Sequence, residues 1–204
     1  MNKPLRITVA FLGLYAGMLG IQHGIFEMLQ GNTAPDGRLF NAIGPPCQTE
    51  AAWHACFPAM SLIPNLLVTG IVAVIVGLAF MLWALFFIQR RHGGWVLGLL
   101  AVVLLLLGGG FMPLFISLIA AGASHSLHHP VARPRFAALA SVWPWPLVIM
   151  AAWMPGSWLV GALFPEAMLA VGGLFFLVFD VGLAVLAAVS GFRFDISCRS
   201  SSPC

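Results

Sequence analysis

The amino-acid sequence predicts an all-α fold, a polytopic membrane bundle of about five transmembrane helices with the third helix interrupted between Gly108 and Pro113. Composition is the first observation behind this prediction, because 61% of the 204 residues are apolar or aromatic and only 7% are charged. An ordinary soluble domain carries about 25% charged residues. The second observation is a series of long apolar stretches separated by segments rich in turn-forming residues. Lipid must therefore solvate most of the chain, which excludes a soluble enzyme, a disordered tail and a nucleic-acid binder.

The first apolar stretch predicts a helix over residues 4–30. Its apolar core runs without interruption from Ile7 to Ile21 and is preceded by Lys3 and Arg6. We expect this helix to be retained rather than cleaved as a signal peptide, because no small-x-small cleavage site follows it. The basic flank predicts a cytoplasmic amino terminus in a multi-pass protein of the cell membrane.

Residues 31–57 form the only long loop, and their density of Gly, Pro, Asn and Asp predicts an ordered segment outside the hydrocarbon. Cys47 and Cys56 lie in this loop and are candidates for a disulfide on an oxidising face of the membrane. Metal binding by the cysteines is disfavoured, because no C-x-x-C spacing is present.

The rest of the chain predicts helices over residues 59–89, 94–123, 136–154 and 166–191, followed by a polar tail over 192–204. In the second stretch Pro58 and Pro64 are expected to set an interfacial first turn, and in the fourth a turn is expected at Pro155 and Gly156. With no internal repeat and no hydrophilic domain, residues 1–204 are expected to form a single integral membrane domain.

The third stretch allows two arrangements. We favour a single crossing, since long apolar stretches usually cross once, but the nine basic residues then divide four against five between the two faces and give no orientation signal. Alternatively the chain folds back between Gly108 and Pro113 as two half-helices of roughly 20 Å each, a re-entrant hairpin. Eight basic residues then lie inside and Arg38 alone lies outside.

Asp180 is the sharpest polar signal in the apolar stretches. It lies near the middle of residues 167–189 without another ionisable residue in that segment, where an uncompensated carboxylate costs about 2.5 to 3.5 kcal/mol. Small residues share its side of the helix, so we expect Asp180 to face the bundle interior. It is either a protonatable or cation-binding group or one partner of a hydrogen bond that locks helices together.

A second polar group is expected on the first helix, where His23, Glu27 and Gln30 form one stripe at i, i+4 and i+7. Glu27 could orient the imidazole or stabilise its charged form. Alternatively Glu27 and Gln30 simply reach the membrane surface, since Glu27 lies about 13 Å from the centre of the span. A direct His23 to Asp180 pair is possible with five crossings and is not expected in the re-entrant arrangement.

Small and polar residues beside these groups suggest how the helices pack. Gly13, Gly17, Gly20 and Gly24 form a face that would let another helix approach closely. Asn65 could add a polar group to the same cavity, although capping of a helix start near the surface is the preferred interpretation.

Metal and cofactor sites receive little support. His125, His128 and His129 have a spacing that could hold a metal on a helix, but Pro130 and Pro134 favour a loop. No cofactor is predicted, and no motif supplies a catalytic residue, so we do not expect an enzyme.

Three segments carry a resemblance, namely QHGIFEMLQGN at residues 22–32, IPNLLVTG at 63–70 and GGGFMP at 108–113. They resemble a group of uncharacterised small multi-pass membrane proteins of prokaryotes over roughly the first 120 residues. The resemblance implies the membrane class and the placement of the spans, and it implies no activity, substrate or cofactor.

Two functions from different classes fit these observations. In the first, a polar site inside the bundle translocates protons or a small solute, with Asp180, His23, Glu27, Gln30 and Asn65 as its candidate residues. In the second, the protein is a non-catalytic accessory or scaffolding subunit, whose partner is a membrane complex or a second copy of the chain. In that case Asp180 and the glycine face would serve helix association.

Overall fold

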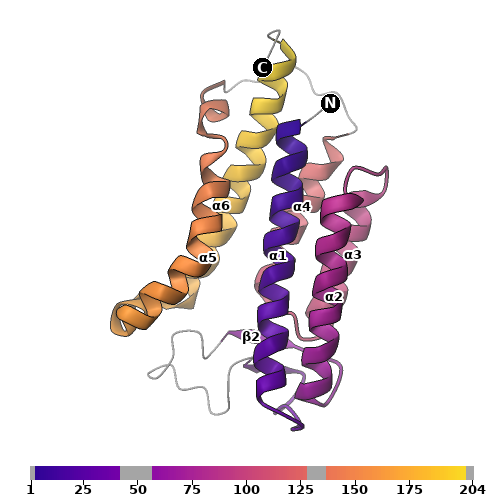
Figure 1. The fold of residues 1–204 in the computed structure, drawn as a ribbon, viewed down its shortest axis with the longest axis vertical. Coiled ribbons are helices and arrows are strands. Elements are labelled where there is room, and N and C mark those ends of the chain that lie inside the picture. Colours follow the sequence, from indigo (N-terminus) through magenta and orange to yellow (C-terminus); the bar gives the residue numbers. More distant parts are fainter. Residues whose placement is uncertain (1–2, 42–56, 128–136, 201–204) are drawn as a thin grey trace.

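A computed structural model describes residues 3–41, 57–127 and 137–200 and confirms an all-α helix bundle (Figure 1). The described elements, in chain order, are α1 (Lys3–Leu29), β1 (Leu39–Asn41), β2 (Pro58–Met60), α2 (Leu66–Phe86), α3 (Gly93–Leu106), α4 (Phe111–His125), the 3-10 helix η1 (Ala137–Val142), α5 (Trp145–Leu163) and α6 (Pro165–Ser200). The two strands pair antiparallel, with Phe40 opposite Ala59.

Four segments are long and apolar enough to span a membrane: residues 4–29 of α1, all of α2, 139–163 around α5 and 175–198 of α6. Helices α3 and α4 have 14 and 15 residues. At 1.5 Å per residue each is roughly 21 to 23 Å long, shorter than the ~30 Å of hydrocarbon. The lengths and composition of the four long helices are compatible with an integral membrane protein.

The third apolar stretch folds back on itself, so the structure has the re-entrant arrangement rather than the five single crossings that we favoured. Helix α3 ends where Gly108 and Gly110 adopt positive φ angles of 97° and 78°, a conformation that glycine adopts without steric cost. The chain then returns as α4, which packs against α3. Figure 1 accordingly shows both ends of the chain at the same end of the bundle. Helices α1 and α6 are antiparallel, because Gly191 lies against Thr8 whereas Asp180 bonds to Tyr15.

Two element boundaries in the carboxy-terminal part differ from the predicted ones. Helix α5 continues through Pro155 to Leu163, where we expected a turn. A proline is tolerated inside an apolar helix when neighbouring groups compensate for its missing hydrogen bond. Helix α6 extends to Ser200, beyond the expected end at residue 191, and the ring of Phe194 in this extension stacks on Trp143 at 4.7 Å.

The second helix also starts later than predicted. Helix α2 begins at Leu66 rather than at residue 59, because Pro58–Met60 pairs with β1. Asn65 is its N-cap, with the side-chain oxygen accepting a hydrogen bond from the Val68 N–H at 3.0 Å. The capping interpretation of Asn65 is therefore the one seen in the structure.

Helix α1 lies at the centre of the bundle and packs against α2, α4 and α6. Its small residues face close neighbours: a Cβ added at Gly24 would lie 2.7 Å from the carbonyl oxygen of Gly70, and one at Gly20 would touch Leu104 of α3. Gly13 and Gly17 lie against Ala84 and Met81 of α2. The predicted glycine face thus lies at the contacts of α1 with α2 and α3.

Candidate polar site between helices α1, α5 and α6

A buried hydrogen bond joins the middle of α1 to the middle of α6. The hydroxyl of Tyr15 donates to the Oδ1 atom of Asp180 at 3.1 Å, and the two side chains are only 4% and 6% exposed. Asp180 faces the bundle interior as predicted from the small residues on its side of α6, of which Ala184 and Ala187 are fully buried. The bond satisfies one carboxylate oxygen and ties the first helix to the last.

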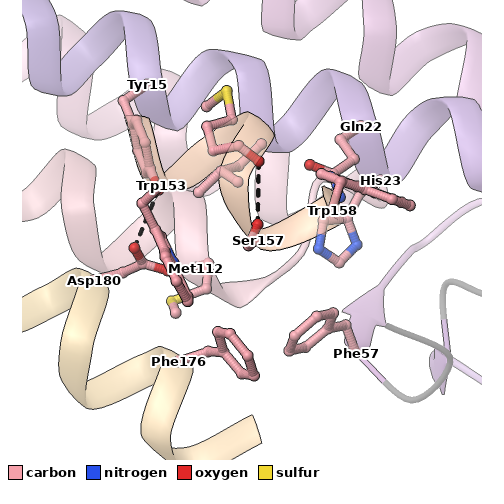
Figure 2. Close-up of a pocket in the computed structure, with 12 residues that line it drawn as sticks. Tyr15, Gln22, His23, Phe57, Met112, Trp153, Ser157, Trp158, Phe176 and Asp180 are labelled. Atoms are coloured by element: carbon pink, nitrogen blue, oxygen red, sulfur yellow. Dashed lines mark hydrogen bonds between the residues drawn. The ribbon is translucent and has the colours of Figure 1, made fainter. Parts of the chain in front are cut away.

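A cavity of about 60 Å³ lies beside this bond, between α1, α5 and α6, and one side chain of α4 also lines it (Figure 2). A single water molecule needs roughly 10 to 15 Å³, so the cavity has room for a few waters. Its polar lining comprises Tyr15, Gln22, His23, Ser157 and Asp180, and its apolar lining includes Phe57, Met112, Trp153, Trp158 and Phe176. The cavity combines an apolar wall with a few polar groups, the usual composition of a small-ligand site.

His23 and Asp180 line the same cavity without forming a direct pair. In Figure 2 the imidazole lies near Trp158 and Ser157, while Asp180 lies beside Tyr15 and Trp153. Along α1, eight residues separate Tyr15 from His23, which is about 12 Å of helix. This separation agrees with the expectation for the re-entrant arrangement.

Glu27 is fully buried, which contradicts the interpretation that it reaches the membrane surface. Both of its carboxylate oxygens are shielded from solvent and have no hydrogen-bond partner. They lie against Gly108, where an added Cβ would clash with Oε1 and Oε2. The ring of His23 lies in the same way against Gly110, with the Nε2 atom 2.5 Å from the position of an added Cβ. The polar stripe of α1 therefore faces the break between α3 and α4.

Backbone groups at this break are bonded to the segment that follows β2. Gly108 N–H donates to the carbonyl of Met60 at 2.9 Å, and Leu62 N–H donates to the carbonyl of Leu106 at 3.0 Å. The buried hydroxyls of Ser61 and Thr69 bond to each other at 2.9 Å. Irregular backbone is tolerated at membrane depth only where protein or water satisfies it, and this segment supplies the partners.

Other predicted site residues lie elsewhere or outside the described residues. The Gln30 amide donates to the Phe26 carbonyl at 3.4 Å at the end of α1, and the Asn65 amide bonds to Asn32 at 2.5 Å. His125 ends α4, while His128, His129, Cys47 and Cys56 are not among the described residues. Within the described ranges no group of three or more His, Cys, Asp or Glu side chains could hold a metal ion.

Sequence reasoning missed Tyr15, which holds Asp180, and Ser157 and Trp153, which line the cavity. Tyr15 carries a usable signal, because it is the only tyrosine in the chain and lies in the middle of an apolar stretch. A buried tyrosine hydroxyl usually finds a hydrogen-bond partner, so its presence there calls for a polar group on another helix. Ser157 and Trp153 carry no comparable signal.

The fold and the site together define a helix bundle with four potential membrane spans, a hairpin of two shorter helices and a cavity that is lined by apolar side chains and a few polar groups. Comparisons of the chain with models of protein families, with curated proteins and with solved structures found no match.

Proposed function

We propose that this protein translocates protons or a small solute across a membrane through the cavity beside Asp180. The observation that carries the proposal is a buried carboxylate in the middle of the bundle that faces a cavity large enough for water. Ionisable residues at such a depth are costly, and in membrane proteins they mark ion pathways and proton relays. Asp180 lines the cavity, and Tyr15 bonds to its Oδ1 atom.

The broken third stretch supports the same proposal. Transporters commonly build their sites at interrupted helices, because the ends of half-helices carry partial charges and free polar groups into the bundle. Here the interruption contacts His23 and Glu27 on α1, and Met112 of α4 reaches the cavity itself.

We further propose that both termini lie in the cytoplasm. The amino-terminal end of α1, the turn between α2 and α3 and the carboxy-terminal end of α6 lie at one end of the bundle. They carry Lys3, Arg6, Arg90, Arg91, Arg193 and Arg199, whereas Arg38 lies near β1 at the other end. An excess of basic residues favours the cytoplasmic face.

The proposal is tested with purified protein reconstituted into vesicles that contain a pH-sensitive dye, with a proton gradient imposed across the membrane. Wild-type protein should dissipate the gradient, and Asp180→Asn should reduce the rate at least tenfold. Asp36→Asn is the matched control, because it removes an exposed carboxylate outside the helices and should leave the rate unchanged. Wild-type vesicles that are no faster than protein-free vesicles would refute proton translocation.

A further inference from the structure

We propose that the carboxyl group of Glu27, at the tip of the α3–α4 hairpin, is a proton-binding site that His23 connects to the Asp180 cavity. The inference rests on the proposed function and names the proton as the species that moves. It assigns the break between α3 and α4 a chemical role rather than only a role in turning the chain.

The environment of Glu27 requires a ligand for the ionised carboxylate. Its side chain has no exposed surface, and neither oxygen accepts a hydrogen bond. Removing an ionised carboxylate from water without a partner is among the costliest changes in a protein interior. Glu27 therefore needs a cation in this structure, and a bound proton is the smallest one.

The surroundings fit a proton better than a metal ion. A hard cation such as sodium or calcium needs several oxygen ligands around it. The nearest side chain from α2 is Thr69, whose methyl group shares the space near Gly108 with the Glu27 oxygens. The Thr69 hydroxyl is engaged with the Ser61 hydroxyl and with the Ile63 carbonyl. At Gly108 the site thus presents one carboxyl group beside a methyl group.

Close packing at two glycines builds this site. An added Cβ at Gly108 would overlap the Glu27 carboxylate, and one at Gly110 would overlap the His23 imidazole. The glycines of the break and Thr69 of α2 lie near Glu27 and His23, and Trp158 and Ser157 of α5 lie near His23, and none of these groups is charged. His23 is the ionisable neighbour of Glu27, one turn away on the same helix.

His23 has the position and the chemistry to pass a proton between the cavity and Glu27. It lines the cavity, its Nδ1 atom is buried without a partner, and it lies about 6 Å from Glu27 along the helix axis. An imidazole can accept a proton at one nitrogen and release one from the other. Because His23 Nδ1 and the Glu27 oxygens have no partner among the described residues, a bridging water takes a proton from the imidazolium and gives one to a Glu27 oxygen, which produces neutral imidazole and a carboxylic acid.

Infrared spectroscopy of the purified protein in lipid at neutral pH tests the site without any flux measurement. The C=O stretch of a protonated carboxylic acid is separated from the amide and carboxylate bands. Wild-type protein should show this band, and Glu27→Gln should lack it. The Asp180→Asn variant should retain the band, and adding Glu27→Gln to that variant should remove it. Glu27→Asp is the conservative control and should keep a protonated-acid band. Equal bands in wild type and Glu27→Gln would overturn the proposal.

Two further readouts separate this inference from the proposed function. Loss of the Glu27 band when sodium replaces potassium at constant pH would show a sodium site and overturn the proton assignment. In the vesicle assay, Glu27→Gln and His23→Gln should each lower the proton flux at least tenfold. Full flux in either variant would overturn the route through His23 and Glu27, while leaving translocation through the Asp180 cavity standing.

Discussion

Tyr15 and Asp180 illustrate how two polar residues in apolar helices determine which helices meet. Each carries a group that lipid cannot satisfy, and their hydrogen bond joins segments that are 165 residues apart in the sequence. Thr8 makes a similar connection nearer the end of α1, because its hydroxyl accepts a hydrogen bond from the indole N–H of Trp143 at 3.0 Å. The first helix is thus tied to the carboxy-terminal part by specific bonds as well as by apolar packing.

The energy of the Tyr15–Asp180 bond is measured by a double-mutant cycle of Tyr15→Phe and Asp180→Ala, with stability followed by reversible unfolding in detergent micelles. We expect a coupling energy of about 0.6 kcal/mol and no more than about 1.7 kcal/mol, the range found for hydrogen bonds between membrane helices. Ser190→Ala is the control, because its buried hydroxyl bonds only to Ala187 of its own helix. Additive effects of the two substitutions would contradict the bond.

The α3–α4 hairpin is the element on which the architecture depends. Its two helices are each too short to cross the hydrocarbon, and the segment after β2 covers the turn between them. Gly108 and Gly110 at this turn adopt a backbone conformation that other residues avoid. Their neighbours are also too close to leave room for a side chain. Those contacts bring the hairpin against the polar stripe of α1.

Gly110→Ala and Gly31→Ala separate the two roles of glycine. Both residues have φ near 78°, but an added Cβ at Gly31 meets no atom within 4 Å, whereas one at Gly110 meets the His23 ring. Both substitutions force an L side chain to a positive φ, and at Gly110 the ψ of 168° adds strain, because only glycine commonly adopts that combination. Overpacking should make Gly110→Ala about 1 to 3 kcal/mol worse than Gly31→Ala in thermal or denaturant unfolding. Equal destabilisation would show that the contact with His23 is not tight.

At the scale of the whole molecule, the described chain forms four long apolar helices and one hairpin of two shorter helices. The two ends of the described chain consequently lie at one end of the bundle, and β1 and β2 lie at the other (Figure 1). The arrangement also collects the basic residues of the helix ends at one end, as the positive-inside pattern requires.

The crossing by α2 and its direction are tested by placing single cysteines in a variant whose four native cysteines are replaced by Ser. Asp36→Cys and His92→Cys are both exposed, near opposite ends of the bundle. A membrane-impermeant maleimide should label Asp36→Cys in intact cells and His92→Cys only after lysis. Labelling of both before lysis, or of both only after it, would contradict α2 as a crossing helix.

Prediction from the sequence succeeded where a local rule was sufficient. The apolar stretches, the interruption at Gly108 and the buried position of Asp180 each follow from the properties of one segment. It failed at Pro155, where α5 continues past a residue that usually ends a helix. It also failed at the end of α6, where the helix continues into a polar segment whose Phe194 packs on Trp143. It also underestimated the burial of Glu27. The position of Glu27 along α1 does not reveal that the α3–α4 hairpin covers the carboxy-terminal end of this helix.

The sequence alone determined that this chain forms a bundle of long apolar helices, and the scarcity of charge and the length of the apolar stretches make it compatible with an integral membrane protein. It also determined which polar residues require a partner, because burial of an unpaired carboxylate is costly wherever it occurs. Only the tertiary structure decided what surrounds each one. Tyr15 bonds to Asp180 because the folded-back hairpin makes α1 and α6 antiparallel, and His23 and Glu27 pack against the glycines of the break. That direction is set by packing between distant segments, which no local pattern encodes.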